Sequence, residues 1–491
     1  MARKEKQMKL WYLTDHSIDE IVDAHIHYVT RPKIEQDEDN SYLEELTDED
    51  RANGLKFPKW HVELKVVEEG DAAPRRTIIK PKYQFLLHVI IMRCRAGKGV
   101  CRLDYAFFTQ LLGKHFGKML HNLSLMGVLY LSDAYVRGKE SRLIELLDWN
   151  ISFYDNTDNR IIRNYLSELD KNNKVKRKEK YKVITEALGK DFTKTYNENL
   201  SQIELARRNE AIEYVNSRDY KSPIQENFYK SSIENFDKET NRITSVDGRG
   251  RIYHYLTNCP RLLRRFFNLK YDVDIANSQP LLFCDFLIKN YNIHLSVIDY
   301  ISNIDNSLLV GDTGSSNIYN KGKQLCKLLK ESGLEVRYLK DIPSDVLLYI
   351  FSCMKGIFWD DFTETFADLE RGEVKESLFR EVFYSHSRTM KYKRYGKVFA
   401  DVYPSVWHLI REMKKDAEQL CDKITKVESE LFHSILEHCF KKGWIVTSIH
   451  DAVVVLDVPG NEHFDEDELI AIILSEYRKH GLIPTVHLEN F

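Results

Sequence analysis

The sequence predicts an α+β protein whose first half is mostly helical and whose second half mixes short strands with helices. Residues 150–240 show long amphipathic helical patterns with little glycine or proline. From Asp247 onward, short strand-like runs alternate with helical segments. Near the C-terminus, two apolar runs flank the pair His450–Asp451, which is the pattern of strand, tight turn and strand.

Composition bounds the class of protein. A chain of 491 residues with 43% hydrophobic and 30% charged residues is typical of a globular protein with two to four subdomains. The formal net charge of −3 does not by itself indicate nucleic-acid binding, so local charge is the better guide. The eight cysteines form no CxxC pair, which predicts reduced, mostly buried thiols rather than zinc ligands or disulfides. No apolar stretch reaches ~18 residues and no signal peptide is recognised, so we expect a cytoplasmic protein without a membrane partner.

The N-terminal half carries no motif but has some organisation. Residues 1–55 are polar and acidic and are expected to form a surface arm. Apolar spacing over 84–131 predicts a small helical or winged-helix domain, and the sequence does not decide between them. A basic run follows, which is either a solvated helix face or a phosphate-binding surface; it contains Lys171, Lys174, Lys176, Arg177, Lys178, Lys180 and Lys182.

Two carboxylates stand at strand-like ends. Asp274 ends the run 271–275, and Asp451 lies at the tip of the C-terminal hairpin. Two acids on adjacent strand ends can hold a pair of divalent cations ~3.5–4 Å apart. Asp272 competes with Asp274, because side chains two residues apart on a strand share a face. We favour Asp274 because a helix-starting sequence follows it directly.

A helix with cationic and aromatic residues lies between these acids in the sequence. Arg371, Lys375, Phe379 and Phe383 recur every four residues, which predicts that they share one helical face; Tyr384 is adjacent.

A Gly/Arg turn, Asp247–Tyr253, precedes the first acid. Its glycines let the backbone approach a nucleic-acid strand closely, and Arg251 can make a forked contact with phosphate. Arg264 and Arg265 follow and also suit backbone binding.

In this order the pieces resemble the T/D-x-x-G-R element and motifs A, B and C of the family A DNA polymerases and the related phage-type single-subunit RNA polymerases. The resemblance covers residues 247–491. It implies a right-hand polymerase fold, with an antiparallel-sheet palm, helical fingers and thumb, and a mostly helical N-terminal domain. The implied boundaries are an accessory domain at 1–135, a helical thumb-like region at 136–245, a palm at 246–280 and 425–491, and fingers at 281–424.

The resemblance also implies residue roles. Asp274, the Ile275 carbonyl and Asp451 would hold two Mg²⁺ ions, with Mn²⁺ as a substitute. His450 would lie near the primer terminus. The motif B helix would bind the nucleotide: Arg371 and Lys375 at the phosphates, Lys375 also as the general acid for pyrophosphate, Phe379 at the sugar and base, and Phe383 or Tyr384 at the templating position.

Gln279 lies five residues after Asp274, where the family places the residue that faces the sugar 2′ position. A bulky side chain there excludes a ribose hydroxyl, so Gln279 favours deoxynucleotides. The related RNA polymerases carry a small residue at this place.

We therefore expect a template-directed DNA polymerase of a phage or mobile element, without a proofreading exonuclease. Its partners would be template, primer, nucleoside triphosphates and, through 1–135, replication proteins. Nucleic-acid contacts are expected from Arg249, Arg251, Arg264, Arg265, Lys176, Arg177 and Lys178. The alternatives are a single-subunit RNA polymerase or primase, since Ala452 replaces the motif C glutamate, and an inactive palm-shaped nucleic-acid-binding module. Glu428 and Glu430 are expected on a solvated helix face.

Overall fold

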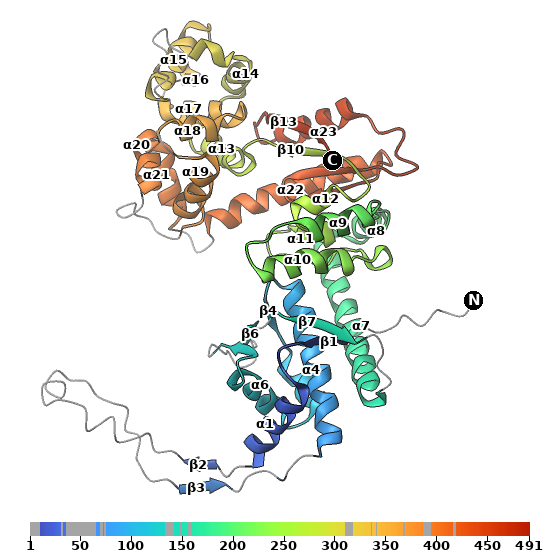
Figure 1. Cartoon of the computed structure of the whole chain (residues 1–491). Helices are drawn as coiled ribbons and strands as arrows, with labels where there is room; N and C mark the ends of the chain where they lie inside the picture. Colours follow the sequence, from blue (N-terminus) through green and yellow to red (C-terminus); the bar gives the residue numbers. More distant parts are fainter. Residues whose placement is uncertain are drawn as a thin grey trace, which may run out of the picture. The chain divides into compact units, whose positions relative to one another are not determined.

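The protein has a mixed α+β fold that is mostly helical, with small antiparallel sheets (Figure 1). The computed structural model describes residues 10–30, 33–35, 65–68, 72, 75–132, 142–147, 149–154, 159–309, 318–334, 336–339, 341–366, 369–385, 394–415 and 419–491. The chain divides into two compact units, residues 1–178 with 214–234 and residues 179–213 with 235–491. The segment 136–245, expected as one thumb-like region, is shared between the two units.

The first unit contains a winged-helix arrangement. Its elements follow in the order α4 (Arg76–Ala96), β4 (Val100–Arg102), α5 (Tyr105–Leu112), α6 (Phe116–Leu125), β5 (Leu129–Leu131) and β6 (Leu143–Leu146). The three strands form an antiparallel sheet in the order β4-β6-β5. This connectivity selects the winged helix from the two alternatives that the sequence left open.

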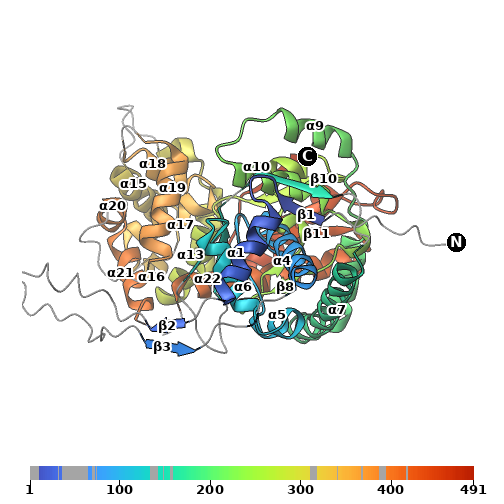
Figure 2. The same cartoon turned by 60° about the horizontal axis from the view of Figure 1, so that its bottom comes forward.

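Helix α1 (Ile18–Thr30) packs on α4 and α6 (Figure 2). Its Ile21, Val22 and Val29 are buried in the core of the unit. The expected surface arm is therefore wrong for this helix, because its apolar residues recur at helical spacing and find a partner face. The acidic cluster at 37–50 lies outside the described residues.

The remaining elements of the first unit are two strand pairs and two helices. They are β1 (Leu10–Leu13) with β7 (Ile151–Tyr154), β2 (Lys33–Glu35) with β3 (Lys65–Glu68), α7 (Arg160–Leu188), which continues into the second unit, and α10 (Pro223–Glu234), which contacts α4.

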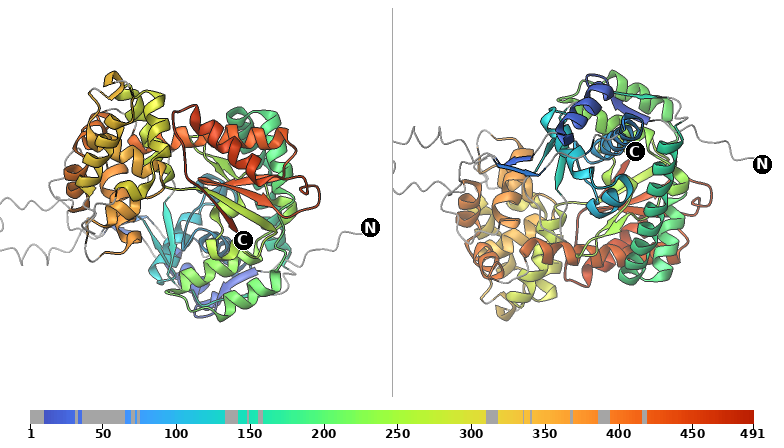
Figure 3. Two further views of the ribbon diagram at one scale, coloured as in Figure 1. Left: turned by 90° about the horizontal axis from the view of Figure 1, so that it is seen from above. Right: turned by 90° about the horizontal axis from the view of Figure 1, so that it is seen from below.

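A four-stranded antiparallel sheet organises the second unit (Figure 3, left). Its strands are β10 (Leu269–Ile275), β11 (Val446–Ile449), β12 (Ala452–Leu456) and β13 (Val486–Asn490), in the order β11-β12-β10-β13. Every residue of β11 and β12 is buried, which explains why β12 reads as a continuous apolar run, whereas β11 also buries the polar Thr447 and Ser448. Helices α8 (Lys190–Leu200) and α22 (Leu420–Lys441) contact β11, and α23 (Glu466–Arg478) packs on α22.

Short elements lead from α8 to the sheet. They are α9 (Arg208–Ser217), which begins in this unit, η1 (Lys238–Thr240), the paired strands β8 (Ser245–Val246) and β9 (Ile252–Tyr253), α11 (Tyr255–Asn258) and α12 (Arg261–Arg264).

The helices between β10 and β11 surround α17 (Ser344–Met354), which is buried from Val346 to Met354. The others are α13 (Ser278–Asn290), α14 (Leu295–Asn303), η2 (Asn306–Leu309), α15 (Ile318–Glu331), α16 (Val336–Leu339), α18 (Phe358–Thr363), α19 (Arg371–Leu378), the π-helical turn η3 (Phe379–Phe383), α20 (Arg394–Val402) and α21 (Pro404–Met413). A helix that is apolar all round belongs at the centre of such a group.

Two expectations from composition can be checked. All eight cysteines are free thiols and six are buried, as expected. Within the part of the chain that the structure describes, no helix has the length and apolarity needed to cross a membrane.

Candidate active site

The structure places Asp274 beside Asp451. Strand β10 pairs with β12 so that Asp274 is opposite Ala452, the residue that follows Asp451. The pKa of Asp274 is raised to about 7. The first cause is that the surrounding protein partly removes the carboxyl group from water, and the second is the negative charge of Asp451 and Asp272. The carboxylate still reaches solvent, which screens part of this repulsion.

The loop that carries Asp451 is the shortest that a hairpin allows. Ile449 pairs with Ala452, so only His450 and Asp451 connect the strands. His450 has a φ of 58°, and a positive φ at the first of two loop residues is the type II′ pattern. Because this turn follows the twist of the strands, it fixes where the Asp451 carboxylate can lie.

Buried polar side chains anchor β11, the edge strand that leads into this loop. His254 Nε2 donates to the Ser448 carbonyl at 2.7 Å, and Tyr196 Oη accepts from the Ser448 amide at 3.1 Å. Asn199 Nδ2 donates to the Val446 carbonyl at 2.8 Å. These contacts satisfy backbone groups that an edge strand would otherwise leave unpaired.

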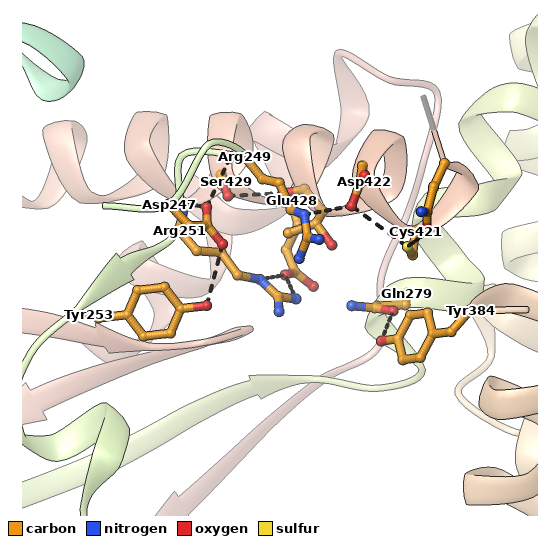
Figure 4. Close-up of polar contacts among 12 residues, drawn as sticks. Asp247, Arg249, Arg251, Tyr253, Gln279, Tyr384, Cys421, Asp422, Glu428 and Ser429 are labelled. Carbon is orange, nitrogen blue, oxygen red and sulfur yellow. Dashed lines mark hydrogen bonds and ion pairs between the residues drawn. The ribbon is translucent and has the colours of Figure 1, made fainter. Parts of the chain in front are cut away.

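The chain turns sharply from β10 into α13. Asn277 takes a left-handed conformation with φ 55°, and α13 begins at Ser278 as the sequence predicts. This turn buries Gln279, which is 8% exposed. Tyr384 Oη donates to Gln279 Oε1 at 2.6 Å (Figure 4).

The expected placement of Arg371, Lys375, Phe379 and Phe383 on one helical face is wrong for Phe383. After α19, residues Phe379–Phe383 form a π-helical turn, and the Tyr384 amide donates to the Phe379 carbonyl five residues back at 2.8 Å. One extra residue in the turn rotates Phe383 into the core, where it is 1% exposed. Tyr384 takes its place and stacks on Phe379 with ring centroids 5.3 Å apart.

The two cations of this helix have different surroundings. Lys375 lies close enough to Asp274 that its charge lowers the pKa of that carboxyl group, against the larger effects that raise it. The Lys375 ammonium is 5.8 Å from the centroid of the Trp359 ring. Arg371 instead pairs with Asp360, with Nε 2.7 Å from Oδ1, and is half exposed.

The Gly/Arg turn is built around Asp247. Its Oδ1 accepts from the Arg249 amide at 2.9 Å and from the Arg251 amide at 3.0 Å. Gly250 has a φ of 89°, and a Cβ there would lie 3.2 Å from the Ser429 side chain of α22. The glycine therefore serves a close approach to α22.

Both arginines of this turn contact acids of α22 (Figure 4). Arg249 Nε lies 2.6 Å from Asp422 Oδ1. Arg251 donates two hydrogen bonds to Glu428 Oε2, one from Nε at 3.0 Å and one from a second guanidinium nitrogen. We expected both arginines to contact nucleic-acid phosphate; here Arg251 is held by a carboxylate.

Glu428 is the site residue that the sequence analysis missed. It is 2% exposed, whereas Glu430 is exposed as expected. Ser278 Oγ donates to Glu428 Oε1 at 3.2 Å. Burial raises the pKa of Glu428, the nearby Asp451 charge adds to this rise, and Arg251 opposes it. The sequence does indicate that Glu428 is buried, because it lies at helical spacing between the apolar Ile424 and Leu431 of α22.

The other predicted nucleic-acid contacts are dispersed. Arg264 is close enough to Asp272 to oppose the rise in the pKa of that carboxyl group, whereas Arg265 is exposed against the Phe266 ring. The remaining three are exposed residues of α7 in the first unit: Lys176, which pairs with Asp104 at 2.7 Å, Arg177, which is 3.6 Å from Asp170, and Lys178.

Few metal-ligating side chains lie together in this region. Among the described residues, no three His, Cys, Asp or Glu side chains gather closely enough to hold a metal ion. Asp274 and Asp451 are the residues that would hold a divalent cation, because burial and then the Asp451 charge raise the pKa of Asp274 and a bound cation would stabilise both ionised carboxylates.

Comparisons with known proteins add nothing to these residues: no family model matches the chain, and no curated protein matches its sequence. The resemblance to family A polymerases therefore rests on the residues and geometry described above.

We expect Arg251→Gln to destabilise the second unit far more than Arg249→Gln. Removing Arg251 leaves the buried Glu428 carboxylate without its ion-pair partner, which should cost about 3–5 kcal/mol. Arg249 and Asp422 are more exposed, so the matched change should cost less than about 1 kcal/mol. Urea unfolding at pH 8.5, above the value of about 7 to which the pKa of Glu428 is raised, measures both. At pH 5 the loss for Arg251→Gln should shrink, because Glu428 then takes up a proton; equal losses for both variants would contradict the assignment.

Asp274→Asn should reveal the cost of placing two like charges together. The pKa of Asp274, about 7, lies above the value of about 3.9 for an unfolded aspartate, so its ionisation disfavours the fold as pH rises between them. At pH 8 without divalent ions, Asp274→Asn should melt about 2 °C or more above the wild type, and at pH 4 the difference should vanish.

Millimolar MgCl₂ at pH 8 should raise the melting temperature of the wild type by about 2 °C or more and leave Asp274→Asn unchanged. The wild-type response should weaken at pH 5.5, because protonation of Asp274 competes with the cation. A magnesium response in Asp274→Asn equal to that of the wild type would remove Asp274 from the metal site.

Proposed function

We propose that the chain is a template-directed nucleic-acid polymerase that adds deoxynucleotides to a 3′-hydroxyl. The observation that carries the proposal is the adjacency of Asp274 and Asp451, with the Lys375 charge beside them. In this proposal the four-stranded sheet is the palm, and the helices around α17 are the fingers. The order of these elements along the chain follows the family to which the motifs bear resemblance.

Asp274 and Asp451 would hold two Mg²⁺ ions. When bound, these ions would lower the pKa of the attacking hydroxyl and neutralise charge on the departing pyrophosphate. The primer 3′-oxygen forms a bond to the α-phosphorus, and the bond from this phosphorus to the bridging oxygen breaks. The hydroxyl proton passes to solvent, and pyrophosphate leaves with a proton from Lys375.

The side chains around the acids position the substrates. The Lys375 charge acts on Asp274, so this ammonium could bind the phosphates of a triphosphate held by the acids. Arg371 would exchange Asp360 for a phosphate, since both are anionic partners of its guanidinium. Phe379 and Tyr384 offer one stacked aromatic surface for the base and sugar.

Gln279 and Tyr384 form the proposed sugar filter. The hydrogen bond from Tyr384 holds the Gln279 side chain in one orientation at the start of α13. A fixed, buried side chain rejects an added hydroxyl more strongly than a mobile one, because it cannot move aside. This favours deoxynucleotides over ribonucleotides.

A single-subunit RNA polymerase or primase is the second candidate. The observation in its favour is Ala452, a buried residue without a carboxylate where the DNA polymerases have glutamate. Glu428 supplies a carboxylate near Asp451 from α22 instead, and Gln279 opposes ribonucleotides.

Primer extension by the purified full chain tests the proposal. Wild type should extend a primed template with dNTPs and MgCl₂, and Asp274→Asn and Asp451→Asn should each reduce single-turnover incorporation by at least about 100-fold, since each removes a ligand of the metals that stabilise the transition state.

Asp272→Asn is the discriminating variant, because Asp272 shares the strand and the face with Asp274. It should retain most activity. Loss with Asp272→Asn and retention with Asp274→Asn would reverse the assignment, and full extension by both Asp274→Asn and Asp451→Asn would end the proposal.

Gln279→Gly should relax sugar selection by about tenfold or more, measured as the ratio of kcat/KM for dNTP and rNTP on one template. Tyr384→Phe should relax it by about two- to tenfold, because one hydrogen bond orienting Gln279 is lost. Tyr395→Phe is the matched control, since it removes a 2.8 Å tyrosine hydrogen bond to Glu373 elsewhere among these helices. An unchanged ratio in Gln279→Gly would exclude the filter.

A further inference from the structure

A hollow of about 570 Å³ lies between the helices and the small sheet of the winged-helix arrangement. Residues of α1, α5, α6, β5 and β6 line it, so it belongs entirely to the first unit. Its volume is within the range of about 300–1,000 Å³ that is usual for small-molecule sites in proteins. The candidate active site belongs to the second unit, so the hollow is not part of that site.

The floor of the hollow is apolar. It is formed by the lining residues Leu103, Phe116, Leu120 and Ile144, each of which is at most 5% exposed. Leu131 adds a half-buried side chain at the end of β5. An apolar group that enters the hollow would exchange water for these side chains, which is favourable. The floor therefore suits the apolar body of a ligand.

Aromatic rings form part of the wall. The ring centroids of Tyr105 and Phe116 are 5.1 Å apart, and those of Tyr28 and His121 are 5.6 Å apart. Gly117 also lines the hollow, and a Cβ there would collide with the Tyr105 hydroxyl. The glycine thus lets the Tyr105 ring lie against α6. Aromatic walls of this kind favour a flat ring system as the occupant.

Three polar side chains form the rim of the hollow: Tyr105, His121 and Arg142, all of which are exposed. Within the part of the chain that the structure describes, the Tyr105 hydroxyl, the His121 ring and the Arg142 guanidinium make no hydrogen bond or ion pair. Each can donate a hydrogen bond. The rim therefore offers several donors above an apolar floor, and this is the usual composition of a ligand site.

The charge at the rim is positive. No aspartate or glutamate is among the described lining residues. Acids close to the lining residues in the sequence have cationic partners of their own: Asp104 pairs with Lys176 at 2.7 Å, and Asp19 and Asp23 of α1 pair with cations of α4. Arg142 stays protonated at every accessible pH, so the hollow favours an anion.

We propose that the hollow binds a small aromatic anion, with its ring system on the apolar floor beside Tyr105 and its carboxylate or phosphate at the Arg142 guanidinium. The forked donors of arginine match the oxygens of either acidic group. The Tyr105 hydroxyl and the His121 ring lie at the same rim and can donate to the ligand as well. This site does not depend on the polymerase proposal, because it needs neither the acids of the second unit nor a nucleic acid.

Isothermal titration calorimetry of the full chain tests the proposal with probes that share one ring system. They are 2-naphthoate, 2-naphthyl phosphate and the neutral 2-naphthamide. At least one of the two anions should bind about tenfold or more tightly than the amide, because only an anion gains charge-assisted hydrogen bonds from Arg142. The anion that binds more tightly identifies the acidic group that the site prefers.

Arg142→Gln should weaken binding of the preferred anion by about tenfold or more and leave 2-naphthamide binding unchanged. Loss of folding would abolish binding of both probes, so this difference reports the ion pair itself. The matched control is Arg102→Gln, since Arg102 is an exposed arginine of the neighbouring strand β4 and is not among the lining residues. It should bind both probes as the wild type does.

Leu131→Trp should fill part of the hollow and weaken binding of every probe by about tenfold or more. Leu147→Trp is its control, because Leu147 is 52% exposed just after β6 and does not line the hollow. Thermal unfolding verifies that each variant is folded, and Arg142→Gln carries the test should Leu131→Trp unfold. Failure of both anions to bind, equal affinity for anions and amide, or equal losses in Arg142→Gln and Arg102→Gln would overturn the proposal.

Discussion

The pairing register between β10 and β12 is the constraint on which the candidate active site depends. It places Asp274 opposite Ala452 and hence beside Asp451. A slip by one residue would turn Asp274 to the other face of the sheet and break the pair. The buried valines of β12 and the polar anchors of β11 resist such a slip. The fold thus keeps two like charges close together beside His450, whose φ is positive, and this combination of electrostatic and backbone strain is typical of functional sites.

Glu428 connects this arrangement to the Gly/Arg turn. It holds Arg251 of the Gly/Arg turn and accepts from Ser278 at the start of α13. Three segments far apart in sequence therefore meet at one buried carboxylate. A buried ion pair is weak evidence for stability, since apolar packing often does as well, but it orients a guanidinium strongly. Arg251 is therefore better understood as a cation held in a fixed place than as a free phosphate ligand.

The sequence predicts the two acids because their signals are local. Asp274 ends a strand of period two before a helix start, and Asp451 lies at the tip of a two-residue hairpin; each pattern is complete within about ten residues. The π-helical turn is different, because no residue pattern in Phe379–Phe383 predicts the extra residue. Packing of Phe383 into the core is what leaves Tyr384 beside Phe379. Residue type alone assigns Glu428 to solvent, whereas its position in the apolar stripe of α22 indicates burial. The sequence does not predict the small sheet of the winged helix, because strands of three or four residues show too little period-two alternation to be recognised.

Density of lysines in the sequence does not by itself identify a binding surface in this chain. The basic run of α7 is the richest in the sequence, yet Lys171, Lys174, Lys176 and Arg177 each pair with a nearby acid. Their field is therefore largely cancelled within a few ångströms, and exposed pairs of this kind contribute little to either stability or long-range attraction. A basic run therefore indicates a binding surface only where the fold leaves its charges unpaired, because attraction of a polyanion depends on the local field rather than on the number of lysines.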